Sequence, residues 1–310
     1  MPDMITLSPK LLCLRLKKNF LTMLITVGAF DGFHKGHEKL LDVCRQNAVN
    51  NDWGVVTFYP HPSEFMGVIA HSLFTFKEKI FISRKLGIPN IFFLKFDEAL
   101  KNLSPFEFID LLIKKFNVTG IVAGSDFHFG HDRTGGIKYL NALAAKDKIK
   151  FFPVNLFNKG VYSSSLVRKK ILEGDVEGAE KILGYHWFII SDVIHGQARG
   201  RKINFPTANI NLTGRLVPSY GVYSTAVLIN NKWYCGACSI GNNPTFGDVK
   251  ETRAEIFITD FEGNLYGSEL LVKFLGRVRG IKTFENPNAL KAQISLDIQT
   301  CKEIFNRSKI

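Results

Sequence analysis

Two histidines, separated by two residues, follow a short apolar segment, and this arrangement limits the fold more than any other part of the 310-residue chain. Residues 23–27 are mostly apolar or β-branched, which is typical of a buried strand. His34 and His37 come next, and from Leu40 onward apolar residues recur at helical spacing. The sequence therefore predicts a strand–turn–helix unit of an open α/β sheet, with both histidines in the turn.

The composition of this turn favours phosphate binding. Ligands of open α/β sheets bind where strands end, and a helix N-terminus offers free backbone N–H groups to a phosphate. Gly36 lets the backbone approach an anion, and two imidazoles can place positive charge or hydrogen-bond donors on phosphate oxygens. Gly28, Asp31 and Gly32 precede the histidines. The alternative is a glycine-rich turn with two exposed histidines.

The first half of the chain alternates apolar segments with helical patterns, which predicts a parallel sheet flanked by helices. Further strands are predicted at 54–58, 91–94, 120–123 and 149–154. Helices are predicted at 76–86, from a capping box at 104–107 onward, at 164–173 and at 176–183. This half is expected to be an α/β domain with a Rossmann-like sheet.

The pattern changes after Gly184. Between 187 and 274, short β-rich segments are separated by Gly, Pro and Asn clusters, which predicts a small antiparallel barrel or sandwich. A helix is predicted from Pro287 to about Phe305, with one apolar stripe packed on the barrel. The stripe consists of Leu290, Ile294, Ile298, Cys301 and Phe305. Two domains, 1–184 and 185–310, are expected.

Composition narrows the class of protein. The net charge is +12, but the lysines are spread along the chain and interleaved with acidic residues, so nucleic-acid binding is not expected. Excess positive charge also suits an enzyme that binds polyphosphates. No segment reaches the ~20 apolar residues that span a bilayer, and a cytoplasmic protein is expected. Cys235 and Cys238 lack a second pair at zinc-site spacing and are interpreted as structural.

Three further segments of the first half could join the histidine turn. His61 stands between two prolines after the second strand, and Asp126 and Phe127 lie in a glycine-rich loop after the fourth strand. Both segments end strands of the same sheet and are candidates for ligand binding. Ser164 and Arg168 stand at a helix start, where they form either an ordinary serine cap or a second phosphate clamp. The residues alone do not decide between these two interpretations.

A site made of histidine, serine and arginine without an activated nucleophile suits direct transfer at phosphorus. In such a site the protein positions two ligands and neutralises charge. The reaction that fits is a nucleotidyl transfer in which the polyphosphate tail leaves as pyrophosphate.

The second half contains a candidate site for Mg²⁺ and a nucleotide. Thr207 and Asn209 stand two residues apart on a predicted strand, so they share one face and offer the oxygen ligands that Mg²⁺ prefers. A basic loop precedes them and could close over phosphates. Its candidate residues are Gly196, Gly200, Arg201 and Lys202. The alternative is a polar β-turn.

Glu255 is an acidic residue in an apolar strand pattern. Such a placement is costly unless the carboxylate has a partner or a task. A kinase needs a group that orients or deprotonates the acceptor hydroxyl, and Glu255 is the candidate base.

Four segments of the first half, GAFDGFHKGHEKLL, TFYPHP, GSDFHFG and YSSSLVR, resemble the adenylyltransferase domain of bacterial bifunctional riboflavin kinase/FAD synthetases. By this resemblance, a first group of residues would bind ATP and its phosphates, with the two histidines stabilising the transition state. That group is Gly28, Phe30, Asp31, His34, His37, Ser164 and Arg168. A second group, His61, Asp126 and Phe127, would contact flavin or nucleotide. The chain departs from the family pattern at Ala29 and Asp126, where asparagine is usual or frequent.

The second half resembles the riboflavin kinase domain through GRKINFPTANI, VPSYGVY, SIGNNPTFG and AEIFITDFEGNLYG. The resemblance implies that Thr207 and Asn209 serve Mg-ATP and that Glu255 is the base acting on the ribityl 5′-hydroxyl. Arg279 and Phe284 would shape the flavin site. Asn204 replaces a glycine that is usual before the FPTAN segment.

Together the resemblances predict an Mg²⁺-dependent enzyme that makes FAD from riboflavin in two steps. Riboflavin would be phosphorylated to FMN, and AMP from a second ATP would then be transferred to FMN. The alternatives are a monofunctional riboflavin kinase with an inactive first domain, or a non-catalytic flavin or nucleotide sensor. A monomer or weak homo-oligomer acting on small molecules is expected, without nucleic acid or membrane.

Overall fold

The computed structural model describes residues 4–8, 11–15, 22–155, 161–196, 205–242 and 252–310. The chain forms two compact units, Met1–Ser163 and Ser164–Ile310, and each is described by itself.

The first unit is built on a seven-stranded sheet in the order β1-β2-β5-β4-β3-β6-β9. The parallel part consists of β3 (Met23–Val27), β4 (Trp53–Tyr59), β5 (Asn90–Lys95), β6 (Val118–Gly124) and β9 (Lys150–Val154). These are the five strands that the sequence predicts. Two antiparallel strands, β1 (Met4–Ser8) and β2 (Leu11–Arg15), extend the sheet beyond β5 and were not predicted.

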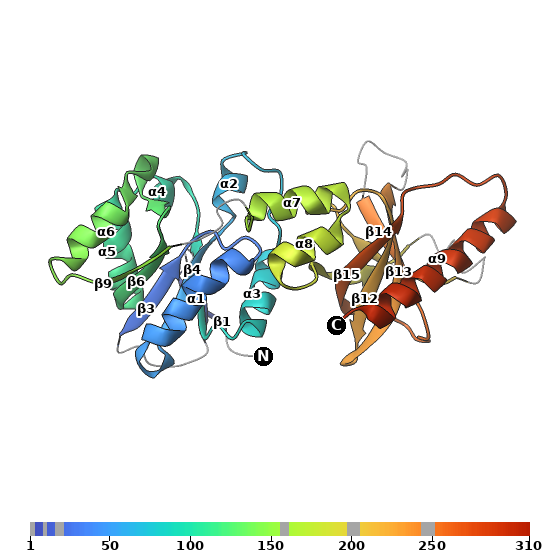
Figure 1. The fold of residues 1–310 in the computed structure, drawn as a ribbon, viewed down its shortest axis with the longest axis horizontal. Helices are drawn as coiled ribbons and strands as arrows, with labels where there is room; N and C mark the ends of the chain where they lie inside the picture. Colours follow the sequence, from blue (N-terminus) through green and yellow to red (C-terminus); the bar gives the residue numbers. More distant parts are fainter. Residues whose placement is uncertain (1–3, 9–10, 16–21, 156–160, 197–204, 243–251) are drawn as a thin grey trace. The chain divides into compact units, whose positions relative to one another are not determined.

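Helices cover this sheet and buried apolar residues of the strands face them. The helices are α1 (Lys35–Asn47), α2 (Pro62–Phe65), α3 (Phe76–Lys85), α4 (Glu98–Lys101), α5 (Pro105–Phe116) and α6 (Ile137–Ala144). Figure 1 shows α1 lying across β3 on one face of the sheet. Helix α5 begins at the predicted capping box, in which Ser104 and Glu107 cap each other's backbone N–H groups. A short hairpin, β7 (His128–Phe129) and β8 (Gly135–Gly136), follows β6.

The strand order of the sheet indicates where a ligand would bind. From β3 the chain continues to β4 and β5 on one side, and it then crosses to β6 and β9 on the other side. Open α/β sheets bind ligands beside the carboxyl end of a strand where the order reverses in this way. The histidine turn follows β3 at that point, as the sequence predicts.

The second unit is centred on a closed barrel in the order β10-β11-β14-β13-β12-β15. Its strands are β10 (Phe188–Ile194), β11 (Thr207–Asn211), β12 (Gly221–Ile229), β13 (Lys232–Asn242), β14 (Thr252–Ile258) and β15 (Glu269–Arg279). Because β10 pairs with both β11 and β15, the barrel has no open edge. The predicted barrel is confirmed, and its interior holds alternate residues such as Tyr223, Phe274 and Ile256.

Helix α9 (Pro287–Arg307) packs on the outside of β12, β13 and β15 (Figure 1). Ser224 on β12 donates a hydrogen bond of 2.9 Å to the Cys301 carbonyl. The predicted apolar stripe lies on the packed side, but the residues most buried are Asp297, Cys301 and Ile304. Cys235 and Cys238 are free and buried, and burial raises the pKa of the Cys235 thiol to about 11, in keeping with a packing role.

Helices α7 (Ser164–Glu173) and α8 (Val176–Leu183) precede the barrel. Gly174 lies between them with φ +82°, and a β-carbon there would overlap Ser219 and Tyr223 of the barrel unit. The compact units therefore group α7 and α8 with the barrel. The predicted boundary after Gly184 groups them with the first domain instead, because their helical pattern continues the α/β alternation.

Candidate active sites

The turn after β3 has an unusual backbone. The Gly28 N–H donates to the Val56 carbonyl at 3.1 Å, which continues the sheet by one residue. Phe30 and Phe33 then adopt φ angles of +42° and +40°, a region that large side chains rarely occupy. Both rings are buried and stack with centroids 5.4 Å apart. Such strain persists only where surrounding packing holds it, and it concentrates at functional sites.

The two histidines lie face to face at the start of α1. Their ring centroids are 3.9 Å apart with 20° between the planes, and the Phe30 ring lies 4.7 Å from His37. His34 is buried, so the alternative of two exposed histidines is wrong. Both Nδ1 atoms are buried without a hydrogen-bond partner among the residues that the structure describes. Buried polar atoms normally have partners, so these nitrogens suit a ligand.

Both imidazoles are neutral near pH 7 in the unliganded protein. Burial lowers the pKa of His34 to about 4 from an ordinary value of 6.5. Burial also lowers the pKa of His37 well below its ordinary value, and the nearby His34 and Lys79 act in the same direction. A neutral imidazole donates one N–H and accepts at its other nitrogen. The pair therefore offers hydrogen-bond donors rather than positive charge.

This lowered pKa predicts an acid-sensitive first unit. Between about pH 6.5 and 4 the unfolded chain binds a proton at His34 that the folded protein does not, so the free energy of unfolding falls as pH falls. The loss attributable to His34 is of order 3 kcal/mol once the pH is below about 4. Urea unfolding at about pH 7 and about pH 4.5 measures it. A His34→Gln variant should lose less stability on acidification, and an equal loss would contradict the assignment.

Asp31 and His61 lie beside the turn. Asp31 is 1% exposed and accepts a hydrogen bond of 2.9 Å from the Leu73 N–H. His61 accepts at Nδ1 from the Ser63 N–H at 3.1 Å, so a neutral His61 carries its proton on Nε2. That nitrogen lies 4.0 Å from the Asp31 carboxylate. The structure therefore brings these two predicted residues together with the histidine turn.

One residue of this site was missed from the sequence. Lys79 on α3 is 2% exposed, and its ammonium donates to the Ala29 carbonyl at 3.0 Å. The Thr57 hydroxyl donates to the same carbonyl at 2.8 Å. A helical lysine normally faces water; the available signal was that Lys79 shares a helix face with the apolar Ile82. At Ala29, whose side chain is apolar, the backbone carbonyl thus makes the polar contacts.

Asp126 and Phe127 follow the carboxyl end of β6, next to β3 in the sheet. The Phe127 N–H donates to the Gly124 carbonyl at 3.0 Å, which fixes a tight turn. Asp126 is exposed, and the half-buried Phe127 ring stacks on Phe129 with centroids 5.3 Å apart. Both residues therefore lie at the same edge of the sheet as the histidine turn.

Ser164 and Arg168 lie on the first turns of α7, and both are half-buried. Since α7 belongs to the second compact unit, their predicted action on the phosphates of the first site stays a prediction.

The barrel aligns the predicted kinase residues across neighbouring strands. Asn209 on β11 is directly opposite Glu255 on β14, and Glu255 is opposite Ser239 on β13. Ser239 is opposite Val222, and Val222 is opposite Arg279. We call Asn209, Glu255, Ser239, Val222 and Arg279 the outer row. Directly opposed residues have their β-carbons about 4.5–5.5 Å apart, so each side chain reaches its neighbours.

The outer row lies on the face of the sheet opposite the barrel interior. Ala254 and Ile256 on β14 are fully buried, whereas Glu255 between them is half-buried. Glu255 thus lies in the strand predicted for it, and strand alternation turns its carboxylate away from the apolar core. Its position next to Asn209 is what the structure adds.

Asn209 is 4% exposed, and its Oδ1 atom is buried without a partner among the described residues. Its amide nitrogen donates weakly to the Thr207 carbonyl at 3.4 Å. Gly196 lies so close that a β-carbon there would overlap the Asn209 amide. A buried oxygen without a partner in the described part of the chain suits a ligand, and the predicted metal-binding role needs such an oxygen.

Replacing Gly196 by alanine should displace the Asn209 amide and so weaken riboflavin phosphorylation. We expect a loss of about tenfold in kcat/KM, since a displacement near the reacting groups costs up to about 10²-fold. Steady-state assays with riboflavin and ATP measure it. FAD formation from supplied FMN in the same preparation is the control and should not change. An unaffected kinase would show that the Asn209 amide tolerates displacement.

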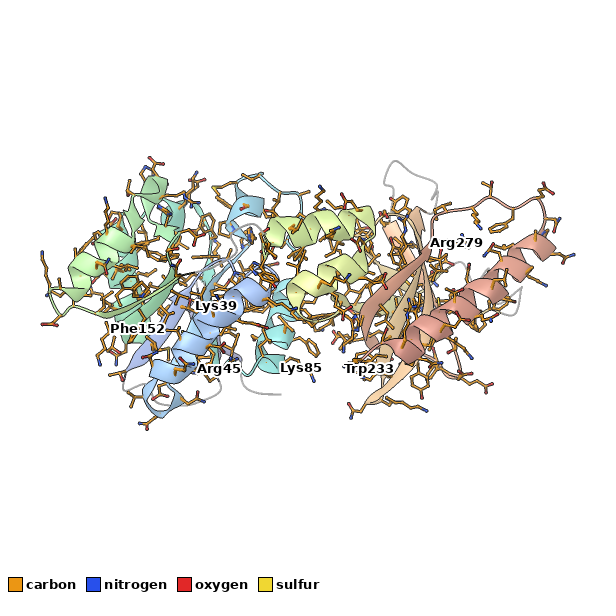
Figure 2. The ribbon with its side chains drawn as sticks, viewed as in Figure 1. Lys39, Arg45, Lys85, Phe152, Trp233 and Arg279 are labelled. Atoms are coloured by element: carbon orange, nitrogen blue, oxygen red, sulfur yellow. The ribbon has the colours of Figure 1, made fainter. Side chains whose placement is uncertain are left out.

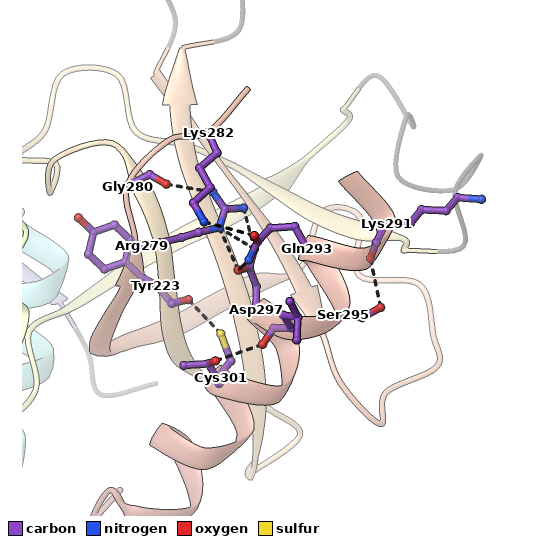
Figure 3. Close-up of polar contacts among 11 residues, drawn as sticks. Tyr223, Arg279, Gly280, Lys282, Lys291, Gln293, Ser295, Asp297 and Cys301 are labelled. Carbon is purple, nitrogen blue, oxygen red and sulfur yellow. Dashed lines mark hydrogen bonds and ion pairs between the residues drawn. The ribbon is translucent and has the colours of Figure 1, made fainter. Parts of the chain in front are cut away.

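Arg279 ends β15 and is held by α9. Its Nε and Nη2 atoms donate to the Asp297 carboxylate at 2.9 and 2.7 Å, and Gln293 donates to the same carboxylate at 2.8 Å (Figure 3). The guanidinium also lies 5.7 Å from the centroid of the Phe284 ring. Arg279 and Trp233 lie toward opposite ends of the barrel (Figure 2). The structure thus brings Arg279 and Phe284 together, and it pairs Arg279 with Asp297, which was not predicted from the sequence.

The predicted phosphate flap is only partly described. Gly196 is described, whereas Gly200, Arg201, Lys202 and Asn204 lie outside the described residues. Across the described ranges there is no group of three or more His, Cys, Asp or Glu residues that could hold a metal ion.

Within those same ranges, no helix combines the length and apolar character needed to cross a membrane.

Comparisons with known proteins match both halves of the chain. A family model described as FAD synthetase matches residues 16–165, and one described as riboflavin kinase matches residues 183–305. The bifunctional riboflavin kinase/FMN adenylyltransferase of Buchnera aphidicola from Schizaphis graminum is 36% identical, over 94% of this chain and 96% of its own length. The Bacillus subtilis protein of the same name is 35% identical, over 91% of this chain and 92% of its own.

A solved structure agrees at the level of the fold. A Streptococcus pneumoniae protein described as a macrolide-efflux protein matches with a TM-score of 0.81 and 30% identity, over 92% of this chain and 95% of that one. The resemblances inferred from the motifs are confirmed over nearly the whole chain. The chain belongs to the family of bifunctional riboflavin kinase/FMN adenylyltransferases.

Proposed function

We propose that the barrel domain phosphorylates riboflavin to FMN with one ATP, and that the α/β domain transfers AMP from a second ATP to FMN, which gives FAD and pyrophosphate. The observation that carries this assignment is the pair of family matches. Residues 16–165 match the FAD synthetase family and residues 183–305 match the riboflavin kinase family. A monofunctional kinase or a sensor is not favoured, because the histidine pair and the Asn209–Glu255 pair are both in place.

Incubating the purified protein with riboflavin, ATP and Mg²⁺ and then separating the flavins tests this function. Both FMN and FAD should form, with pyrophosphate released in step with FAD. FMN alone would leave a monofunctional kinase, and the absence of both products would reject the proposal.

In the α/β domain, a phosphate oxygen of FMN attacks the α-phosphorus of ATP, and the bond from that phosphorus to the bridging oxygen of pyrophosphate breaks. The N–H groups of His34 and His37 donate to phosphate oxygens as charge develops, together with the backbone at the start of α1. Ser164 and Arg168 hold the polyphosphate, and His61, Asp126 and Phe127 contact flavin or nucleotide. The sheet edge shared by β3, β4 and β6 supports the grouping of His61, Asp126 and Phe127 with the histidine turn.

In the barrel, Glu255 accepts the proton of the ribityl 5′-hydroxyl while that oxygen attacks the γ-phosphorus of ATP and ADP leaves. The outer row supports this assignment, because Glu255 lies directly opposite Asn209 on the neighbouring strand. Arg279 and Phe284 hold the flavin further along the same face. Ser239, opposite Glu255, completes the surface on which the acceptor hydroxyl approaches.

Mg²⁺ fits this site by the chemistry of the donors. The buried Asn209 Oδ1 lacks a partner in the described part of the chain, and Thr207 two residues away offers a hydroxyl. These are hard oxygen ligands, which Mg²⁺ combines with waters and nucleotide phosphates. Thr207 and Asn209 would hold the ion, which when bound supplies positive charge that neutralises the phosphates.

We place the functional boundary between the domains after Gly184. The motif that contains Ser164 and Arg168 belongs to the adenylyltransferase pattern, although helices α7 and α8 pack with the barrel unit. We further expect a cytoplasmic monomer or weak homo-oligomer that binds neither nucleic acid nor membrane. The even spread of lysines along the chain supports the expectation that the protein does not bind nucleic acid.

A further inference from the structure

We propose that Lys79 is a positioning residue for adenylyl transfer, which holds the Ala29 carbonyl and thereby the turn that stacks His34 on His37. This inference rests on the proposed function of that turn. In this role Lys79 acts through the turn and not through a contact with the substrate.

Two elements fix one carbonyl. Helix α3 begins at a capping box in which Thr75 and Glu78 cap each other, and this sets the position of Lys79 one residue later. From there the Lys79 ammonium reaches the Ala29 carbonyl at 3.0 Å, while the Thr57 hydroxyl on β4 reaches it at 2.8 Å. Ala29 therefore accepts hydrogen bonds from a helix and from the neighbouring strand at the same time.

A buried lysine is costly, so its retention needs a reason. Burial lowers the pKa of Lys79, while the charges of Asp31 and Glu64 act in the opposite direction. Taking an ammonium out of water is repaid only where geometry and partners are good, and an apolar side chain of similar size would serve packing equally well. Among the described residues, the ammonium donates a hydrogen bond to the Ala29 carbonyl and to no other group. Holding that carbonyl is the task that accounts for the charge.

The held carbonyl belongs to the peptide that enters the strained turn. Fixing it sets the plane of the peptide between Ala29 and Phe30, and Phe30 has the unfavourable φ of +42°. The Phe30 ring in turn lies 4.7 Å from the His37 ring. A continuous chain of contacts therefore runs from Lys79 through one peptide to the catalytic histidines. The lysine charge also favours a neutral His37, since it lowers the pKa of that ring.

A double-mutant cycle on Lys79→Met and Thr57→Val tests this role. FAD formation from FMN and ATP gives kcat and the KM for ATP, and riboflavin phosphorylation in the same preparation reports on the barrel. We expect Lys79→Met to lower kcat for FAD formation by about 10²-fold, as misplacement of catalytic groups does. The KM for ATP should change by less than about threefold, because no contact with ATP is lost. Riboflavin phosphorylation should stay unchanged.

Non-additivity is the signature of a shared carbonyl. Thr57→Val alone should lower kcat by less than Lys79→Met does. The double variant should have a kcat little lower than that of Lys79→Met, because the effects of two residues that act through the same group are not additive. Lys85→Met removes an exposed lysine from the same helix and is the matched control (Figure 2). It should leave both activities at the wild-type level.

Several results would overturn the proposal. An unchanged kcat in Lys79→Met rejects it, and a raised KM for ATP with unchanged kcat makes Lys79 a substrate-binding residue instead. Multiplicative losses in the double variant would show that Lys79 and Thr57 act separately. If Lys79→Met does not fold, the Thr57→Val variant tests the proposal instead. A normal kcat for FAD formation in Thr57→Val would show that holding the Ala29 carbonyl does not matter for the reaction. A wild-type protein that makes no FAD would instead reject the proposed function.

Discussion

Replacing His34 by alanine should lower the rate of FAD formation by about 10³-fold, whereas the same preparation should phosphorylate riboflavin at the wild-type rate. Removal of one preorganised donor to developing phosphate charge costs about 10²–10³-fold in rate. His34 also supplies one face of the stacked pair, so its loss frees the His37 ring, whose centroid lies 3.9 Å away. The upper end of that range is therefore expected.

The experiment for His34 supplies FMN and ATP directly and follows FAD and pyrophosphate. The kinase activity of the same chain is the folding control, because the variant leaves every barrel residue unchanged. FAD formation within about tenfold of wild type would remove His34 from the transition state. Parallel loss of both activities would argue against two separate sites.

Replacing Glu255 by glutamine should have the converse effect. General base catalysis contributes about 10²–10⁴-fold, so riboflavin phosphorylation is expected to fall by about 10³-fold. Glutamine keeps the size of the side chain and its hydrogen-bonding ability beside Asn209 and Ser239, but it cannot accept the hydroxyl proton. The change therefore separates proton transfer from a structural role of Glu255.

With FMN supplied, the Glu255→Gln variant should make FAD at the wild-type rate, and with riboflavin alone it should make little of either product. Glu262→Gln, which alters an exposed carboxylate shortly after the same strand, is the matched control and should leave both activities intact. A Glu255→Gln variant that retains most of its kinase activity would assign proton removal to another group.

The parallel core of the first unit could be predicted from the sequence because buried strands are continuous apolar segments. The predicted segment 23–27 coincides with β3, and the capping box at Ser104 marks the start of α5. Strands β1 (Met4–Ser8) and β2 (Leu11–Arg15) were missed because they form an antiparallel hairpin in which β2 adds to the edge of the sheet beside β5. Their position depends on that pairing and not on a local pattern.

In the candidate sites, too, residues near a recognisable element could be predicted, whereas residues that act through distant contacts could not. The histidine turn lies within a few residues of one strand, so its position followed from the order of elements. Lys79 could not be identified, because its task depends on a carbonyl 50 residues away. Asp297 was obscured by the apolar stripe around it, and its partner Arg279 lies 18 residues away in sequence. Local pattern thus predicts where chemistry can occur, and tertiary packing decides which side chains support it.

Strand β15 also determines when the barrel can close during synthesis on the ribosome. It pairs with both β10 and β12, so neither barrel closure nor the outer row is complete until Arg279 has been synthesised. The first compact unit ends at Ser163, which is 116 residues earlier. At a synthesis rate of about 5–20 residues per second, this gap lasts roughly 6–23 s. The nascent chain therefore contains the whole seven-stranded sheet with the histidine turn well before the barrel can close.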